Sequence, residues 1–193
     1  MKRLILAGIL GGLVLFVWEA VAHEALPLGE AGVRALDNEQ VQTALKANIK
    51  DSGFYIFPMP DMAAMSKEQQ QKAMAQAEEK MRAGPTGIMV VYPQGREFLM
   101  PQHLATQAIT DLLTGLLAAT LLYWAASLKS YSSRVLFIVL LGLFPTLTVE
   151  LPQWNWYGFP TVYMLAQLAM HLIGFLLAGL LLARMVRPKF APA

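Results

Sequence analysis

Four long runs of apolar residues alternate with more polar stretches along the chain. A helix that crosses a bilayer needs about 20 mostly apolar residues, and each run comes close to this length. Because the runs contain few charged residues, we expect all four to span a membrane as helices. The predicted spans occupy residues 1–22, 104–126, 135–151 and 161–183.

The basic residues indicate how these helices are oriented. Lysine and arginine are enriched in the short cytoplasmic flanks of membrane helices. If four spans alternate in direction, the flanking basic residues all fall on one side: Lys2, Arg3, Lys129, Arg134, Arg184, Arg187 and Lys189. We therefore expect a cytoplasmic N-terminus, a cytoplasmic loop over residues 127–134 and a cytoplasmic tail over residues 184–193.

The opposite side of the predicted bundle has a different composition. The short loop over residues 152–160 has no lysine or arginine and contains Trp154, Trp156 and Tyr157. Tryptophan and tyrosine gather at membrane–water interfaces, so these three residues are predicted interfacial anchors. Residues 23–103 fall on the same side and are predicted to form a periplasmic domain.

The first apolar run also has features of a secretory signal peptide. A basic start precedes the apolar stretch, and Ala20-Val21-Ala22 has the spacing of small residues that is typical of a cleavage site. However, the stretch is long for a signal, and Trp18 and Glu19 crowd the site. We expect residues 1–22 to be retained, whereas cleavage after Ala22 would leave three spans.

The pattern within residues 23–103 predicts a small α/β domain. Helix-start patterns occur at Asp37 with Gln40 and at Ser66 with Gln69, each polar pair three residues apart. The predicted order is a helix from Asp37 to Gly53, a strand over 54–57, a helix from Ser66 to Ala83, a strand over 88–92 and a third strand over 97–100. Two helices with few apolar residues, packed on so small a sheet, bury little apolar surface. We therefore expect this domain to be stabilised by packing against the bundle, the membrane surface or a partner protein.

The predicted fold class is a membrane all-α four-helix bundle with a small extracytoplasmic α/β insertion of the order helix–strand–helix–strand. Composition agrees with this division, because 56% of the 193 residues are hydrophobic and only 15% are charged. The net charge of +2 and the dispersed basic residues argue against nucleic-acid binding. The chain has no cysteine, which excludes disulfides, thiolate metal sites and covalent c-type haem.

Six ionisable residues lie within or at the ends of the predicted spans. They are Glu19, His23, His103, Asp111, Glu150 and His171. Charged groups in a membrane are costly and are therefore functional candidates. All six fall in the outer half of the predicted bundle, where they would form a polar pocket open to the periplasm. Asp111 and His171 are the deepest of them and are expected to bond each other.

Three interpretations of this pocket are considered. In the first, which we favour, they are interface groups and a pair that locks the bundle. In the second they form a proton or small-ligand pocket, and in the third a metal or haem site. A second candidate is the methionine series Met59, Met62 and Met65, because thioethers bind Cu(I). Methionine also fills irregular apolar gaps, so packing is the preferred explanation there. We expect no resident cofactor.

Two segments of the sequence resemble a known group of proteins. The stretch ELPQWNWYGFP, followed by a span with Gly174 and Gly179, resembles the C-terminal half of a family of bacterial inner-membrane proteins. The opening GGLVLFVWEAVAH and the following LPLGE resemble the N-terminus of the same family. That family is uncharacterised, so the resemblance implies a bacterial four-span inner-membrane protein and no activity.

The sequence contains no Ser-x-Gly nucleophile elbow and no HExxH motif. We therefore expect a non-catalytic membrane protein, an accessory or structural subunit of a larger respiratory or photosynthetic complex. Its expected partners are the lipid bilayer and other membrane subunits. The alternatives are a small transporter or proton-handling protein that uses the outward-facing pocket, and a metal- or haem-binding membrane protein.

Overall fold

A computed structural model of the chain describes residues 1–125 and 127–187. The chain divides into two compact units. Met1–Arg34 and Leu99–Ala193 form the first, termed the helical unit, and Ala35–Phe98 form the second, termed the small unit. Ala126, the predicted end of the second span, and residues 188–193 of the predicted tail, with Lys189, lie outside the described residues.

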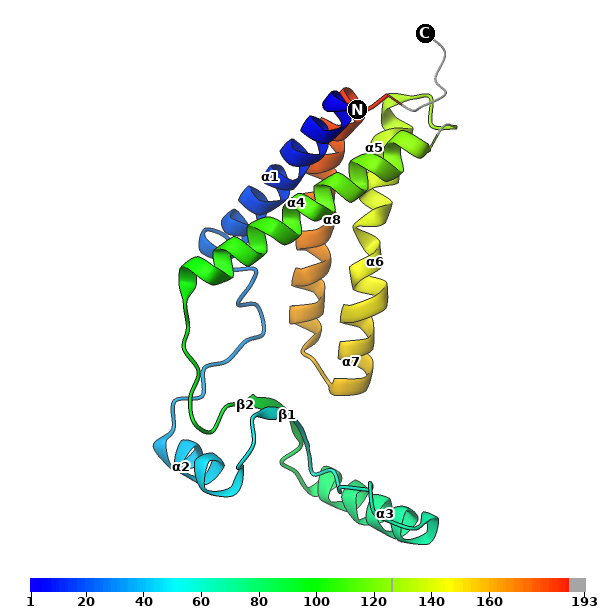
Figure 1. Cartoon of the computed structure of the whole chain (residues 1–193). Helices are drawn as coiled ribbons and strands as arrows, with labels where there is room; N and C mark the ends of the chain where they lie inside the picture. The colour runs from blue at the N-terminus through cyan, green and yellow to red at the C-terminus, as the bar shows by residue number, and fades with distance from the viewer. Residues whose placement is uncertain (126, 188–193) are drawn as a thin grey trace. The chain divides into compact units, whose positions relative to one another are not determined.

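The helical unit contains the predicted long apolar helices (Figure 1). They are α1 (Lys2–Glu24), α4 (Met100–Trp124), a continuous helical stretch over Tyr131–Tyr157, and α8 (Thr161–Met185). In the described part of the chain these four are long and apolar enough to cross a membrane. This confirms the four predicted helical segments and supports a multi-pass membrane protein.

The third helical stretch is longer and less regular than predicted. It comprises α5 (Tyr131–Leu141), α6 (Leu143–Pro145), the π-helix η1 (Thr146–Glu150) and α7 (Leu151–Tyr157). The prediction that Trp154, Trp156 and Tyr157 lie in a loop over 152–160 is therefore wrong, because all three belong to α7. Pro152 does not stop the helix, because η1 continues through Leu151 and Pro152 into α7 with helical backbone throughout. The helix ends only at Gly158, whose φ of 70° gives the left-handed cap that suits glycine.

The predicted third strand over Glu97–Met100 is also wrong. Residues 96–99 have no regular structure and Met100 begins α4. Pro101 in the first turn of α4 favours a helix start at this point. His103 consequently lies inside the helix rather than before it.

Glycines allow α1 to pack very closely against α4. A Cβ atom added at Gly115 would overlap the backbone of Gly8 and Gly12, and one added at Gly12 would lie 2.5 Å from the carbonyl oxygen of Asp111. Small residues at such positions let helix backbones approach, which is the usual means of helix association in membranes. Contacts along the helices show that α1 also packs on α8, and that α8 packs on α5.

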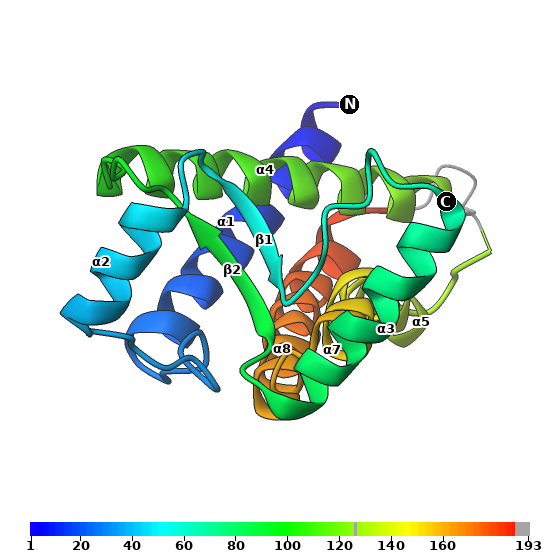
Figure 2. The same ribbon diagram turned by 90° about the horizontal axis from the view of Figure 1, so that it is seen from below.

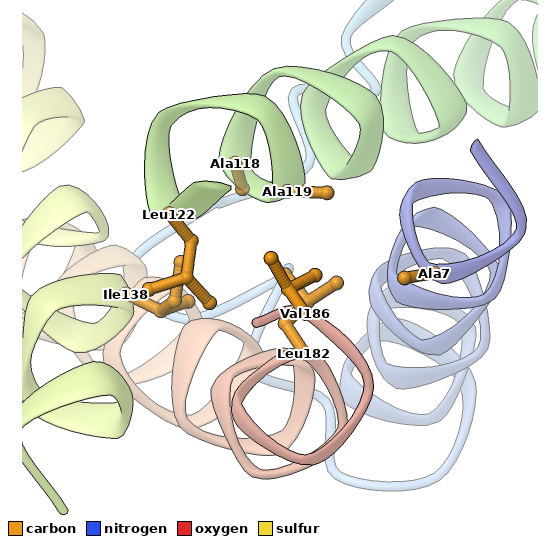
Figure 3. Close-up of a cluster of buried hydrophobic side chains, with 7 residues drawn as sticks. All are labelled: Ala7, Ala118, Ala119, Leu122, Ile138, Leu182 and Val186. Atoms are coloured by element: carbon orange, nitrogen blue, oxygen red, sulfur yellow. The ribbon is translucent and has the colours of Figure 1, made fainter. Parts of the chain in front are cut away.

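A cluster of buried apolar side chains draws on all four helical stretches (Figure 3). It comprises Ala7, Ala118, Ala119, Leu122, Ile138, Leu182 and Val186. Ala7 lies near the start of α1, whereas Leu122 and Leu182 lie near the ends of α4 and α8. The core is therefore concentrated at the end of the helical unit where α1 begins.

The small unit has the predicted helix–strand–helix–strand order. Its elements are α2 (Glu39–Asn48), β1 (Gly53–Phe57), α3 (Lys67–Ala83) and β2 (Gly87–Val91). The strands pair antiparallel, with Phe54 opposite Val90, and they lie between α2 and α3 (Figure 2). The predicted capping box of α3 is confirmed, because Ser66 and Gln69 bond each other's backbone N–H groups. The cap of α2 is Asn38 rather than Asp37, since the Asn38 side chain accepts a bond from the Val41 N–H at 3.0 Å.

Candidate functional site

Polar side chains within the apolar helices gather in two separate clusters. The first joins α1 to α4 through Glu19, Gln107 and Asp111. Gln107 Nε2 donates to Glu19 Oε2 at 2.5 Å and lies 3.2 Å from both carboxylate oxygens of Asp111. Asp111 is only 5% exposed, so this network satisfies a group that would otherwise be costly to bury.

The chemistry of this first cluster follows from its charges. The carboxylates of Glu19 and Asp111 both contact a single amide group, so they lie close together. Two negative charges at short range in an apolar medium repel each other strongly. A proton or a cationic group at this point would relieve the repulsion, which makes the cluster suited to binding a positive species.

A pocket of 310 Å³ lies beside the first cluster, between α1 and α4. Its lining residues are Phe16, Glu19, Ala20, His23, Glu24, His103, Leu104 and Gln107. The structure thus brings together the predicted candidates Glu19, His23 and His103, with Asp111 bonded through Gln107. His23 also has a local role, because its Nδ1 lies 2.9 Å from the Glu19 carbonyl oxygen and its ring lies against Gly29.

The second cluster joins η1 to α8. His171 Nε2 lies 3.1 Å from Glu150 Oε1, and Glu150 is 8% exposed. The other carboxylate oxygen, Glu150 Oε2, and the hydroxyl of Thr146 are buried, and neither has a hydrogen-bond partner among the described residues. Buried polar atoms without partners are rare and call for an explanation, such as a bound water or ion.

The predicted bond between Asp111 and His171 is wrong. Asp111 bonds Gln107 on its own helix, and His171 bonds Glu150 instead. The cause is the packing of the helices, since α4 packs mainly on α1, whereas α8 packs mainly on α1 and α5 and touches α4 only slightly. The six predicted residues therefore do not form one pocket.

The remaining candidates are placed as follows. Trp154 Nε1 donates to Thr161 Oγ1 at 3.0 Å, which ties α7 to the start of α8, and Trp156 is 79% exposed. In the small unit, Met59 and Met65 line a pocket of 260 Å³ with Lys80, and Met62 is not among its lining residues. The ammonium group of Lys80 would oppose a metal cation there.

Within residues 1–125 and 127–187, no group of three or more histidine, aspartate or glutamate side chains is arranged to hold a metal ion. Comparison with protein-family models, curated proteins and solved structures finds no match to this chain.

Proposed function

We propose that the chain is a non-catalytic protein of the bacterial inner membrane, an accessory or structural subunit of a larger membrane complex. In this proposal both termini are cytoplasmic and the small unit is periplasmic. The positively charged flanks described above support this orientation. The complex would be a respiratory or photosynthetic assembly.

The observation that carries the proposal is how few side chains are buried within the small unit. Ala77 is the one fully buried side chain among residues 35–98. A domain with so small a core gains little free energy from apolar burial. Contact with another molecule would supply the burial that the unit does not provide for itself.

The strands of the small unit offer a surface for such a contact. Phe54 lies opposite Val90, and Ile56 lies opposite Ile88, so these four side chains share one face of the sheet. Phe54 is 54% exposed and Val90 is 61% exposed. Exposed apolar faces of this kind are typical of protein-interaction sites, and we name these four residues the sheet patch.

Co-purification from native membranes in a mild detergent tests the proposal. We expect the full-length tagged chain to retain a stoichiometric membrane partner, and the double variant Phe54→Ser with Val90→Ser to lose it. Lys72→Gln is the matched control, because Lys72 lies on the exposed side of α3 in the same unit. A monodisperse chain without a partner, or a partner that binds both variants equally, would contradict the proposal.

A second candidate function is supported by the first polar cluster. The pocket beside Glu19, Gln107 and Asp111 would suit a small transporter or a protein that handles protons or small cationic ligands. Replacing Asp111 with asparagine removes a charge and preserves the shape of the side chain. If Asp111→Asn leaves both the protein level and the cellular phenotype unchanged, this second function fails.

A further inference from the structure

We propose that Glu150 and Thr146, with the Glu150 carboxylate positioned by His171, bind one sodium ion at the π-helix in the third helical stretch. This inference concerns the helical unit alone and does not depend on the proposed docking of the small unit. It rests on two buried oxygens, Glu150 Oε2 and Thr146 Oγ1, that have no hydrogen-bond partner in the described part of the chain.

The first step of the argument is the position of the two oxygens. Thr146 and Glu150 are the first and last residues of η1, four positions apart on one helix. Residues at this spacing lie on the same side of a helix. Thr146 is 5% exposed and Glu150 is 8% exposed as whole residues, and the Glu150 side chain is 10% exposed, so both are about nine-tenths buried or more.

The second step is the charge that must be compensated. A carboxylate removed from water needs a neighbouring positive charge and hydrogen-bond donors to both oxygens. His171 serves Oε1, but it leaves Oε2 without a donor. The elements packed on η1 are α6, α7 and α8, and their ionisable side chains are Tyr157, Tyr163, His171 and Arg184. Arg184 is 13 residues from His171, or about 20 Å along the helix axis, and is too far away to help.

The third step is the identity of the ion. Carboxylate and hydroxyl oxygens are hard ligands, which suit alkali and alkaline-earth cations. The site holds one carboxylate, so a single positive charge balances it, whereas calcium and magnesium sites generally need more acidic ligands. Irregular helix segments supply sodium ligands in membrane transporters, where backbone carbonyls add to side-chain oxygens.

The role of His171 follows from this arrangement. With Nε2 donating to Glu150 Oε1, the imidazole fixes the rotation of the carboxylate and turns Oε2 toward the ion. His171 is therefore a positioning residue rather than a ligand. The π-helix also favours a sodium site at this position, because π-helical turns are uncommon and are frequently found at functional sites.

Thermal unfolding of the full chain in nanodiscs of zwitterionic lipid tests the site. Sodium chloride replaces choline chloride stepwise at constant ionic strength. We expect the Tm to rise with the logarithm of sodium concentration, on the order of 4 °C at ten times the Kd. Glu150→Gln and Thr146→Val should abolish the sodium dependence.

Thr148→Val is the matched control. Thr148 lies in the same π-helix, but it is exposed and its hydroxyl bonds the Phe144 carbonyl at 2.6 Å. This variant should keep the full sodium response. Equal Tm values in sodium and choline, a response to pH alone, or an undiminished sodium response in Glu150→Gln would each overturn the proposal.

A direct measurement of sodium binding to the unaltered protein tests the proposal even if the variants do not fold. Equilibrium dialysis with radioactive sodium should give saturable binding of one ion per chain. Binding that does not saturate, or that excess choline displaces as well as excess unlabelled sodium, would also overturn the proposal.

Discussion

The helical unit and the small unit are stabilised by opposite means. In the helical unit, glycines such as Gly12 and Gly115 bring helix backbones into contact, and seven residues from four helical stretches and the segment after α8 form a buried cluster. In the small unit, Ala77 alone is fully buried among the described residues. The small unit depends instead on local features, above all the strand pairing and the capping box at Ser66.

This difference shows where each unit is sensitive to change. A close helix–helix contact has no room for an added side chain, so substitutions there act through steric overlap. A unit without a packed core responds mainly to changes in caps and pairings, each of which contributes about 1 kcal/mol or less. Four substitutions, taken from the largest expected effect to the smallest, test this contrast.

Gly115→Leu should have the largest effect. The new side chain would overlap the backbone of Gly8 and Gly12, so α1 and α4 must separate. We expect a loss of about 3 kcal/mol or more in the free energy of unfolding, or no monodisperse protein. Leu117→Ala is the control on the same helix, because Leu117 is 60% exposed, and similar stabilities for the two variants would refute the close contact.

Gln107→Leu should have the next largest effect. This change removes the donor shared by Glu19 and Asp111. A buried acceptor left without its partner costs about 1–3 kcal/mol, which thermal unfolding of the purified protein would measure. Gln102→Leu, at an exposed position of α4, should change stability little. An equal loss in both variants would mean that the network contributes nothing specific.

Ser66→Ala should act on the small unit alone. The serine hydroxyl accepts a bond from the Gln69 N–H at 3.3 Å at the start of α3. Loss of such a cap costs about 1 kcal/mol, so we expect faster hydrogen exchange of the α3 amides. Exchange in α1 and α8 should stay the same, and a change there would show that the two units unfold together.

Lys72→Gln should have the smallest effect. Lys72 Nζ lies 3.1 Å from Glu68 Oε1, but both side chains are more than 70% exposed. Exposed ion pairs four residues apart on a helix contribute about 0.3–0.5 kcal/mol. Hydrogen exchange in α3 should therefore match the unaltered protein within error, and an effect as large as that of Ser66→Ala would contradict this ranking.

The sequence predicts those features that depend on local pattern. Apolar run length predicts the four long helices, and the capping box at Ser66 and Gln69 locates the start of α3 correctly. Errors arise at the boundaries of the long helices. Helix α4 begins at Met100, before the predicted residue 104, with Pro101 in its first turn. The third helical stretch runs from Tyr131 to Tyr157, beyond both ends of the predicted span over 135–151.

The candidate site is only partly predictable, because depth along a helix does not indicate which helices are neighbours. Asp111 and His171 lie at similar predicted depths, but α4 packs mainly on α1 and touches α8 only slightly, so each residue finds a different partner. Gln107 was missed because an uncharged amide does not stand out in an apolar helix. Its position four residues before Asp111, one turn along the same face, was the available signal.

The packing of α1 against α4 and α8 has a consequence for how the protein is made. Gly115 is synthesised about 100 residues after Gly12, a delay on the order of 5–20 seconds at typical translation rates. The other neighbour of α1 is α8, which is the last of the four long helical stretches to emerge from the ribosome. During this interval the glycine face of α1 has no native partner, so the nascent helix must wait in lipid or beside the insertion machinery until the rest of the chain arrives.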